Sequence, residues 1–436
     1  MEVKEPSTTY LAKPAYKQAA VGVIPSDWDV ATIGELASTS SGTTPARAQA
    51  DRYFRNGTIS WVKTLDLNNG GISETEETVT QTALTETSLQ LYPAGCVLVA
   101  MYGGYNQIGR TGILLISATV NQALTAIQPN TKRLHADYLL RVLNFRIDYW
   151  RTVASSSRKD PNITSKDIRE FPLALPPLTE QRAIAEAISD ADALIDALER
   201  LLTKKRQIKQ GAMQELLTGR KRLPGFAGKW KTRALCDLFN FNGGFTASRD
   251  QLSIDGHCYL HYGDIHTSNK SYIDVISEFL EIPKLNIPLN KVRTSSLLKD
   301  GDVVFVDASE DDEGTSKHVV VINQGDIPLI SGLHTIAAKS KTDELANIYK
   351  MYCFQTPAVK AQFRFFSVGT KVSGISKSNI GKITISVPSI EEQTAIAIIL
   401  SDMDAEIATL EAKLTKARSV KRGMMQQLLT GKIRLI

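Results

Sequence analysis

The chain has 436 residues, of which 42% are hydrophobic and 22% charged, a composition typical of a globular protein with two or more domains. Its net charge of +5 is small for this length and favours a nucleic-acid partner only weakly. The four cysteines are far apart and indicate neither a disulfide framework nor a thiolate zinc site, and no apolar run approaches the ~18 residues of a membrane span. We expect a cytoplasmic protein without a membrane partner.

The first half of the chain predicts a short tail and one α+β domain. Residues 1–20 have no counterpart in the second half, and we assign them as an N-terminal tail. Residues 57–128 are rich in Thr, Val, Ile, Tyr and Gly, with short alternating runs between turn dipeptides, which is typical of strands and loops. A helical stretch follows at 134–150. We therefore place the first domain at 21–175.

Residues 176–222 predict one long helix. Apolar residues recur from Ile184 onward at alternating steps of four and three, which is the spacing of a single buried helical stripe. Pro176 and Pro177 suit a helix start, and Gly219 suits a helix end. Such a helix would have about 38 residues and a length of roughly 57 Å.

The second half repeats this organisation. When the sequence is shifted by 212, residues 176–223 align with 388–435 without a gap, and 27 of the 48 positions are identical. A fainter match opens the two halves, with Trp28 opposite Trp230. Between these conserved ends the halves resemble each other only in pattern. The predicted second half comprises an α+β domain at 223–387, with a helical stretch at 343–366, and a long C-terminal helix at 388–436.

Each long helix carries an apolar stripe that must be buried against a partner. The simplest partner is the other copy, which predicts an antiparallel coiled coil with an internal pseudo-twofold axis. Two separate helices, each covering its own domain, are the alternative. The residues expected to pair the helices are Ile184, Ile188, Ile195, Leu198, Leu202, Ile396, Leu400, Ile407, Leu410 and Leu414.

Catalytic signatures are not found in the sequence. It has no GxxxxGK[ST] phosphate-binding loop and no Asn- or Asp-Pro-Pro-aromatic stretch for adenine methylation. His257, His261 and His266 are close in sequence, but their spacing within a strand-like segment does not bring them to one ion. The acidic run at 310–313 is interpreted as a solvated loop. We predict a non-catalytic chain that holds no cofactor or metal.

Polar, aromatic and basic side chains gather in the predicted loops of both domains. Arg, Lys, Asn and Gln can contact base edges in pairs of hydrogen bonds, and Ser, Thr and Lys can hold phosphates. The candidates in the first domain are Lys63, Thr64, Asn68, Asn69, Tyr105, Asn106, Gln107, Arg110, Asn121, Gln122, Arg158 and Lys159. The candidates in the second domain are His261, Tyr262, His266, Asn269, Lys270, Lys317, His318, Lys371 and Ser373.

The whole pattern resembles the specificity (S) subunit of Type I restriction-modification systems. The resemblance rests on the opening YKQAAVGVIPSDWDV (16–30), on PPLTEQRAIA (176–185), and on two MQxLLTG endings (213–219 and 425–431). It implies two target-recognition domains that each bind one half of a split double-stranded DNA site, with the paired helices setting the gap between the halves.

The resemblance also implies partner subunits. In this family the S subunit docks two modification (methyltransferase) subunits, which use S-adenosylmethionine to methylate adenine at N6. These assemble with restriction/translocase subunits that require ATP and Mg. This chain would then be the DNA-binding subunit of a methyltransferase and endonuclease complex.

Three alternatives remain open at this stage. A related two-site or methylation-only system would use the same kind of recognition subunit. A coiled-coil adaptor that binds only protein would have the same helices, but it does not explain why the domains differ while the helices are conserved. A metal-dependent nuclease using the acidic run at 310–313 would need a second carboxylate–lysine cluster.

Overall fold

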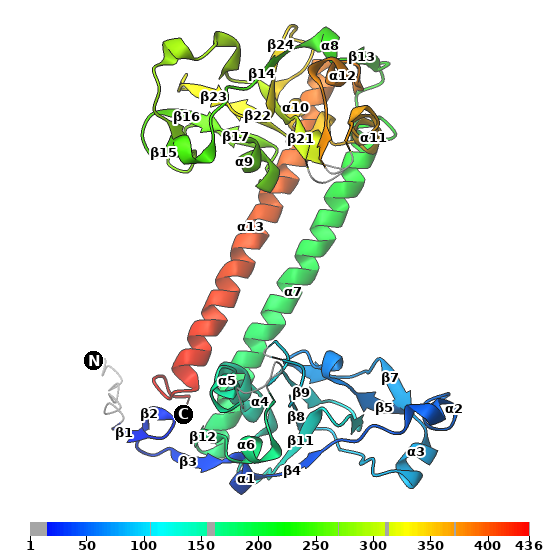
Figure 1. The fold of residues 1–436 in the computed structure, drawn as a ribbon, viewed down its shortest axis with the longest axis vertical. Coiled ribbons are helices and arrows are strands. Elements are labelled where there is room, and N and C mark those ends of the chain that lie inside the picture. The colour runs from blue at the N-terminus through cyan, green and yellow to red at the C-terminus, as the bar shows by residue number, and fades with distance from the viewer. Residues whose placement is uncertain are drawn as a thin grey trace, which may run out of the picture. The chain divides into compact units, whose positions relative to one another are not determined.

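The structure is a computed structural model that describes residues 15–104, 106–154, 162–268, 270–309, 314–369 and 372–435. Its contacts divide the chain into two compact units: unit 1 comprises Met1–Glu199 and Lys413–Ile436, and unit 2 comprises Arg200–Ala412. Each unit holds one α+β domain and one end of both long helices (Figure 1). These helices are α7 (Leu178–Leu216) and α13 (Ile390–Leu428), each of 39 residues, in agreement with the predicted lengths.

The domain of unit 1 is built on a five-stranded sheet. Its two central pairings are antiparallel, and the short edge strand β6 runs parallel to β9. β8 and β9 are fully buried, which accounts for their continuous runs of apolar and small residues. In spatial order the strands are β4 (Ala37–Ser41), β11 (Leu124–Pro129), β8 (Val97–Ala100), β9 (Thr111–Leu114) and β6 (Gly71–Ile72).

The domain of unit 2 has a five-stranded sheet with the equivalent strands in the same spatial order. The parallel edge pairing recurs as well, because β17 runs parallel to β22. The similarity that the sequence shows only as a pattern is therefore a shared topology. In spatial order the strands are β14 (Phe239–Gly243), β24 (Thr335–Ser340), β20 (Val303–Val306), β22 (His318–Ile322) and β17 (Tyr272–Asp274).

A second sheet of short strands lies in each domain, with three strands in unit 1 and five in unit 2, and each contains one parallel pair. In unit 1 the pair is β5 with β10, and in unit 2 it is β16 with β23. The strands of unit 1 are β10 (Thr119–Val120), β5 (Ile59–Val62) and β7 (Glu77–Val79). Those of unit 2 are β15 (Leu252–Ser253), β18 (Lys284–Leu285), β16 (His257–Leu260), β23 (Leu329–Ser331) and β19 (Leu297–Leu298).

Short helices and two-stranded ribbons complete the domains. The helical stretches expected at 134–150 and 343–366 are each divided into two helices. The helices of unit 1 are α1 (Ile33–Leu36), α2 (Ala50–Tyr53), α3 (Gln81–Glu86), α4 (Ala136–Phe145), α5 (Tyr149–Val153) and α6 (Ser165–Arg169). Those of unit 2 are α8 (Leu235–Leu238), α9 (Tyr262–Thr267), α10 (Asn347–Cys353), α11 (Pro357–Phe366) and α12 (Lys377–Gly381). The paired ribbons are β3 (Asp29–Thr32) with β12 (Pro172–Leu175), β13 (Lys231–Ala234) with β26 (Thr384–Val387), and β21 (Ala308–Ser309) with β25 (Ser373–Gly374).

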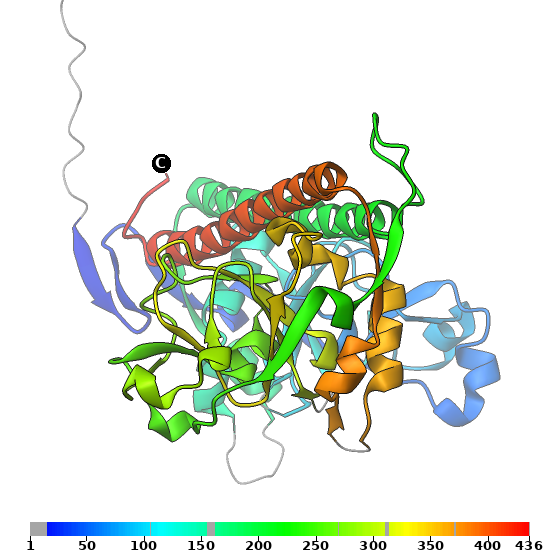
Figure 2. The same cartoon turned by 90° about the horizontal axis from the view of Figure 1, so that it is seen from above.

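Part of the predicted N-terminal tail is ordered in unit 1. β1 (Tyr16–Ala19) and β2 (Gly22–Pro25) form an antiparallel hairpin, and the Tyr16 hydroxyl donates a hydrogen bond to the carbonyl oxygen of Gly431 at 3.3 Å. The hairpin thus lies beside the end of α13 (Figure 2). Residues 1–14 of the tail lie outside the described residues.

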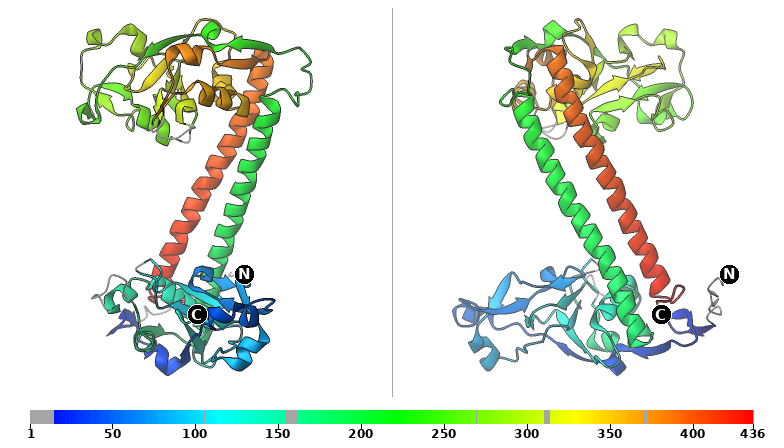
Figure 3. Two further views of the ribbon diagram at one scale, coloured as in Figure 1. Left: turned by 45° about the vertical axis from the view of Figure 1, so that its right-hand side comes forward. Right: turned by 180° about the vertical axis from the view of Figure 1, so that it is seen from behind.

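Within each unit the two long helices run side by side in opposite directions (Figures 1 and 3). In unit 1 Arg418 pairs with Glu199 at 2.6 Å, and Lys421 pairs with Asp192. In unit 2 the residues displaced by 212 pair in the same way. They are Arg206 with Glu411 at 2.6 Å, and Lys209 with Asp404. The reciprocity of these ion pairs shows that the helix repeat is also a structural repeat.

The apolar stripe of the helices is buried in two settings. Near the domains, Ile184 and Ile188 join the core of unit 1, and Ile396 and Leu400 join the core of unit 2. Farther along the helices, the residues that are less than a tenth exposed are Ile195, Leu202, Leu410 and Leu414, whereas Leu198 and Ile407 are half-buried. Within the described residues, no helix is long and apolar enough to cross a bilayer.

A buried ionic cluster joins the start of one long helix to the end of the other in each unit. In unit 1 the Glu180 carboxylate accepts hydrogen bonds from Trp28 Nε1 at 3.0 Å and from Arg434 Nε at 2.7 Å. In unit 2 Glu392 accepts from the equivalent tryptophan at 3.0 Å and from the equivalent arginine at 2.5 Å. We call these the end clusters; they consist of Trp28, Glu180 and Arg434 in unit 1, and of Trp230, Glu392 and Arg222 in unit 2.

The glutamine that follows each of these glutamates accepts an equivalent backbone hydrogen bond in both units. Gln181 accepts a hydrogen bond from the backbone N–H of His135 at 2.8 Å, just before α4 begins. Gln393 accepts from the backbone N–H of Ala346 at 2.9 Å, just before α10. Both glutamines are fully buried, and each satisfies a backbone donor that would otherwise lie unpaired at a helix start. The repeated Glu-Gln dipeptide therefore has a structural cause.

Candidate nucleic-acid interface

Two loops meet where the parallel strands of the small sheet end in unit 1. β5 runs into a turn at Thr64–Asp66, where Asp66 Oδ2 accepts a hydrogen bond from the backbone N–H of Lys63 at 2.7 Å. β10 runs into residues 121–123, where Asn121 Oδ1 accepts from the N–H of Ala123 at 3.1 Å. Because the carboxyl ends of neighbouring parallel strands lie at one edge of a sheet, both loops emerge together.

A third loop joins them from the large sheet. It follows β8, and its first residue, Met101, donates its N–H to the carbonyl oxygen of Ala123 at 2.8 Å. Ile163 donates its N–H to the carbonyl oxygen of Met101 at 3.1 Å, which adds the segment before α6. We call this three-loop region the loop edge of unit 1; it comprises residues 63–69, 101–104, 106–110 and 121–123. Of the twelve candidates in the first domain, nine described residues lie on it.

Unit 2 has the same three loops at the equivalent strand ends. Asp264 Oδ2 accepts from the N–H of His261 at 3.2 Å, in the position that Asp66 occupies in unit 1. Asp307 donates its N–H to the carbonyl oxygen of His334 at 3.1 Å, and Ile375 donates to Asp307 at 2.8 Å. The loop edge of unit 2 comprises residues 261–268, 270, 307–309, 314–317 and 332–334. The two edges share their backbone contacts but differ in their side chains.

On the unit 1 edge, many of the predicted side chains shape the loops. Asn68 bridges the turn by donating to the Gly71 carbonyl at 3.0 Å and accepting from the Gly70 N–H at 2.8 Å. Asn69, whose φ of 60° is left-handed, accepts from the Thr111 N–H at 3.1 Å. Arg110 donates to the carbonyl oxygen of Leu67. The candidates exposed on this edge are Asn68, Asn69, Asn106 and Gln122, and Thr64 and Gln107 are half-buried.

Lys63 belongs to an ionic network beside this edge. Its Nζ lies 2.7 Å from both Glu76 and Glu77, and the pKa of the lysine is raised mainly by its hydrogen bond to Glu76. Glu77 also pairs with Arg47 at 2.7 Å, and this contact is the main reason that the pKa of the carboxyl falls to about 2. Arg47 in turn lies 4.2 Å above the ring of Phe54. Two carboxylates therefore hold the Lys63 ammonium group in place and compensate its positive charge.

On the unit 2 edge, the side chains include aromatic rings at positions where unit 1 has Thr64 and Ala123. Tyr262 packs edge-on against His334 with ring centroids 5.4 Å apart, and His334 Nδ1 lies 3.2 Å from Asp307 Oδ1. His334 has a left-handed φ of 56°, a strained conformation that the surrounding loop imposes. The side chain of His334 is half exposed. His261 differs: its side chain is buried, and burial is the main cause that lowers its pKa.

A basic extension of the unit 2 edge is formed by Lys317 and Lys270. Lys317 Nζ lies 2.5 Å from the carbonyl oxygen of His266, which ties the loop after β20 to the end of α9. Lys270 is exposed and pairs with Glu278 at 3.2 Å. Ser373 lies in β25, which pairs with β21 at the start of the same loop. The structure therefore brings most of the described candidates of the second domain to one edge.

His318 is the exception, because it lies in the core of unit 2. Its ring packs against Phe305 and Phe354 at centroid distances of 5.5 and 5.0 Å. Complete burial lowers the pKa of this histidine to about 4. The prediction placed it in a polar loop with Lys317, but it is the first residue of β22 and faces inward. A DNA contact is not compatible with this position, and we remove His318 from the candidate set.

Several other candidates cannot be placed, and two residues were missed. Tyr105, Arg158, Lys159, Asn269 and Lys371 lie outside the described residues, as does the acidic run at 310–313. Arg249, which the sequence did not single out, is exposed and lies 3.3 Å from Asp264 at the unit 2 edge. Asp307 was also missed. Each pairs with a residue of another loop, Arg249 with Asp264 and Asp307 with His334, so the local sequence gave no signal.

Two equivalent loop edges on two copies of one α+β domain, each copy joined to a long helix, define a tandem recognition scaffold. The family model described as Type I restriction modification DNA specificity domain matches the chain twice, over residues 25–210 and 227–417. The chain belongs to this Type I restriction-modification specificity family. The match confirms the resemblance drawn from the sequence and identifies the two α+β domains as the DNA specificity domains of a specificity subunit.

Known proteins with similar sequences and folds span almost the whole chain. The putative type I restriction enzyme MjaX specificity subunit of Methanocaldococcus jannaschii is 23% identical and aligns with 96% of this chain and 97% of its own length. The EcoKI specificity subunit of Escherichia coli is 20% identical over 95% of this chain and 90% of its own. The solved S subunit from M. genitalium has the same fold, with a TM-score of 0.57 and 14% identity over 96% of this chain and 99% of its own.

Proposed function

We propose that this chain recognises a bipartite double-stranded DNA target, with each loop edge contacting one half of the target. The observation that carries this is the pair of loop edges. Their backbone hydrogen bonds are equivalent in the two units, whereas the side chains at equivalent positions differ, as Lys63 and Thr64 do from His261 and Tyr262. A shared scaffold with different side chains is what two different half-sites require, since bases are distinguished by donor and acceptor patterns in the groove.

We assign the DNA contacts to polar side chains that are exposed or half-buried at each edge. On unit 1 the proposed contacts are Lys63, Thr64, Asn68, Asn69, Asn106, Gln107, Arg110, Asn121 and Gln122, with the undescribed Tyr105, Arg158 and Lys159. On unit 2 they are Tyr262, His266, Lys270, Lys317, His334 and Ser373, with His261 as a loop-shaping residue and the undescribed Asn269 and Lys371. Amides that hydrogen-bond to their own loop, such as Asn121, contribute through loop shape.

Membership of the family supports a proposal for the wider assembly. We propose that the chain is non-catalytic and acts as the scaffold of a Type I complex, in which it binds two modification subunits and, through them, restriction/translocase subunits. S-adenosylmethionine, ATP and Mg would then belong to those subunits. The repeat of the helix ends around the buried end clusters supports this proposal, because two copies of one partner need two equivalent surfaces. The paired helices would set the distance between the two half-sites.

The test is to map N6-methyladenine by single-molecule sequencing in a host that expresses this chain with its candidate modification subunit. A split motif is expected. Gln122→Ala should relax base preference in one half of the motif, and His334→Ala should relax it in the other half. His257→Ala is the matched control, because His257 lies on β16 at the end away from the loop edge, and it should leave the motif unchanged.

The role of the helices is tested in the same assay. Replacing both Leu198 and Leu410 with Asp should abolish the motif, because an aspartate in each helix stripe opposes their pairing. If wild-type chain and modification subunit are both soluble and no motif is methylated, the proposal fails. If His334→Ala and Gln122→Ala alter the same half of the motif, the assignment of one half to each edge is wrong.

A further inference from the structure

A fourth loop lies beside the loop edge in each unit and is held there by equivalent contacts. In unit 1 it follows β4 and comprises residues 42–49, and Thr43 donates its N–H to a carbonyl oxygen at the end of β10 at 2.9 Å. In unit 2 it follows β14 and comprises residues 244–251, and Phe245 donates its N–H to a carbonyl oxygen at the end of β23 at 2.7 Å. Each loop edge is therefore bordered by one more loop.

One aromatic side chain of the second sheet anchors this fourth loop in each unit. In unit 1 Trp61 Nε1 donates a hydrogen bond to the carbonyl oxygen of Thr43 at 3.2 Å. In unit 2 the hydroxyl of Tyr259, at the equivalent position of β16, donates to the carbonyl oxygen of Phe245 at 2.7 Å. The same hydroxyl accepts from the N–H of Leu333 at 2.7 Å, which ties the fourth loop to the loop after β23. Both rings are buried, so the loop has a rigid support.

An arginine begins a short 3₁₀ helix in the fourth loop of both units. These helices are Arg47–Gln49 in unit 1 and Arg249–Gln251 in unit 2, and they coincide with the shift of 202 that relates β4 to β14. In unit 1 the guanidinium of Arg47 lies 2.7 Å from Glu77 and 4.2 Å above the ring of Phe54. Arg47 is therefore held against the strands and helices that surround the second sheet of unit 1.

The arginine of unit 2 has a different setting, because it lies against the loop edge. Arg249 Nη2 donates to Asp264 Oδ1 at 3.3 Å, and Asp264 Oδ2 accepts from the N–H of His261 at 3.2 Å. The carboxylate that caps the first loop of the edge thus also holds the guanidinium. The side chain of Arg249 is 64% exposed, so its other N–H donors can reach a ligand.

Gly263 makes room for this arginine. A Cβ atom on residue 263 would lie 2.6 Å from Arg249 Nη2, which is closer than Cβ contacts in proteins come. The equivalent residue of unit 1 is Leu65, whose side chain is exposed. Unit 2 therefore has a glycine where the guanidinium crosses the start of α9, and unit 1 has a leucine where Arg47 pairs with Glu77 instead.

A guanidinium held by a carboxylate at the edge of a domain suits one feature of DNA in particular. Guanine presents two acceptors, O6 and N7, in the major groove, and an arginine can donate to both at once. The Asp264 carboxylate compensates part of the charge of Arg249 and orients the plane of its guanidinium. This arrangement favours a contact defined by hydrogen-bond geometry over a phosphate contact defined by charge.

We propose that Arg249 recognises a guanine in the half-site bound by unit 2, by donating hydrogen bonds to its O6 and N7 atoms. Asp264 and Gly263 are positioning residues for the guanidinium. The inference rests on the proposed function and deepens it, because it names one base of the target. Arg47 has no such role in unit 1, because Glu77 and Phe54 hold it.

The experiment uses the full-length chain together with its candidate modification subunit. The methylated motif of the wild type gives the half-site of unit 2 as the half that His334→Ala changes, and this half should contain a fixed G·C pair. Arg249→Gln should admit other bases at that position alone. In competition binding, the preference of the wild type for the G·C duplex over the corresponding A·T duplex should fall by roughly 5- to 150-fold in Arg249→Gln. Arg249 is exposed, so urea denaturation should resemble that of the wild type.

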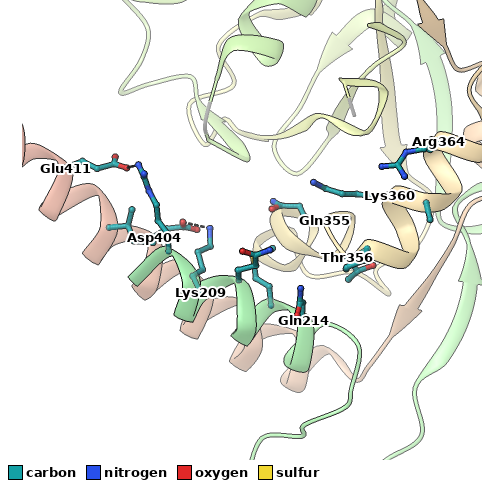
Figure 4. A pocket seen from close by; sticks show the side chains of 14 residues that line it. Lys209, Gln214, Gln355, Thr356, Lys360, Arg364, Asp404 and Glu411 are labelled. Atoms are coloured by element: carbon teal, nitrogen blue, oxygen red, sulfur yellow. Dashed lines mark hydrogen bonds and ion pairs between the residues drawn. The ribbon is translucent and has the colours of Figure 1, made fainter. Parts of the chain in front are cut away.

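A second variant and a matched control separate guanine recognition from other effects. Gly263→Ala places a Cβ atom against the end of the flexible Arg249 side chain, so the protein should fold normally while the preference for guanine falls. Arg206→Gln is the control, because Arg206 is exposed to a similar extent, 59% against 64%, and also pairs with one carboxylate. Its partner Glu411 lies on α13, in the groove that the long helices form with α11, outside the loop edge (Figure 4). This control should leave the motif unchanged.

The possible outcomes distinguish this inference from the proposed function. If the half-site of unit 2 contains no G·C pair, or if Arg249→Gln leaves every position of the motif unchanged, the guanine contact is wrong and the proposed function stands. If Arg249→Gln weakens binding to all duplexes alike and lowers the slope of log K against log salt by about 0.9, Arg249 contacts a phosphate instead. If the wild type directs no split motif, the proposed function itself has failed.

Discussion

The end clusters and the loop edges differ in which features are the same in the two units. In the end clusters every residue is the same in both units, and the distances agree within 0.2 Å for the tryptophan and arginine hydrogen bonds to the glutamate. On the loop edges the backbone hydrogen bonds agree, but the exposed side chains differ. The clusters must satisfy a buried carboxylate, which permits few substitutions. The edges must only hold their loops in place, which leaves the outward side chains free to change.

The largest effect is expected from breaking an end cluster. Glu392→Ala leaves Arg222 and the indole N–H of Trp230 without their shared acceptor, and the free energy of unfolding should fall by about 3 kcal/mol. Urea denaturation of the full-length chain measures this loss. Glu391→Ala, one residue away and exposed, is the matched control and should change stability by less than about 0.5 kcal/mol.

The same substitution in unit 1 sharpens the comparison. Glu180→Ala removes the acceptor of Trp28 and Arg434, and Arg434 also pairs with Asp27 at 2.7 Å. Because Asp27 still forms an ion pair with Arg434 in this variant, we expect the free energy of unfolding to fall by the same amount as in Glu392→Ala or by less. A much larger loss in unit 1 would show that the two clusters are not energetically equivalent.

A pH dependence should distinguish unit 2 from unit 1. Burial lowers the pKa of His318 in the folded state to about 4 from an ordinary value of 6.5, and the equivalent position in β9 is Thr111, which does not titrate. Between pH 6.5 and pH 4 the unfolded chain therefore binds more protons than the folded chain at this site. The stability contributed by neutral His318 is complete above pH 6.5 and falls by up to ~3 kcal/mol as the pH is lowered to 4.

The measurement is urea denaturation of wild type and His318→Phe from pH 7.5 to pH 4.5. Phe keeps an aromatic ring against Phe305 and Phe354 and removes the titrating group. The variant should lose less stability on acidification than the wild type does. His257→Gln, at a half-buried site, should keep the wild-type profile. Parallel profiles for wild type and His318→Phe would contradict the assignment.

The two long helices and the internal repeat could be predicted from the sequence, because each produces a pattern of residues that can be seen along the chain. Gly219 is predicted to end the first long helix, and Gly219 and its counterpart Gly431 have left-handed φ values of 70° and 68° just beyond α7 and α13. Most of the stripe that begins at Ile184 is buried, but Leu198 and Ile407 are half-buried. The reciprocal ion pairs were not predicted, since partner choice in an antiparallel pair depends on a register that neither helix shows alone.

The loop edges could be predicted in composition but not in geometry. Sequence indicated polar loops, yet it could not show that residues near 63, 101 and 121 meet, because those contacts depend on strand order. His318 was misplaced for the same reason: it adjoins Lys317 in a polar run but begins a buried strand. Arg249 was missed because its contact with Asp264 joins two separate turns.

A moderate effect is expected from the aspartates that cap the first loop of each edge. Asp66→Ala and Asp264→Ala each remove an acceptor of a backbone N–H, and each should cost about 1 kcal/mol of stability. Each should also relax base preference in its own half of the methylated motif. Asp255→Ala, in an exposed turn of unit 2, should do neither. Loss of both half-motifs from a single substitution would show that the edges are coupled.

The smallest effect is expected from the reciprocal ion pairs of the helices. The Glu199–Arg418 pair is about half exposed, as is its counterpart Glu411–Arg206, so a double-mutant cycle on either should give 0.2–1 kcal/mol. Structural equivalence predicts that the two coupling energies agree within about 0.3 kcal/mol.

One further ion pair shows the limit of that equivalence. Lys205 pairs with Glu406 at 2.6 Å in unit 2, but the corresponding residues in unit 1 are Ala417 and Leu194. Replacing Glu406 with Leu and Lys205 with Ala would give unit 2 the residues of unit 1. Because the pair is partly exposed, this exchange should change stability by less than about 1 kcal/mol. A loss in the free energy of unfolding well above that value would mean that the exposed parts of the two helix pairs are not interchangeable. The equivalence of the two units would then be limited to their buried residues.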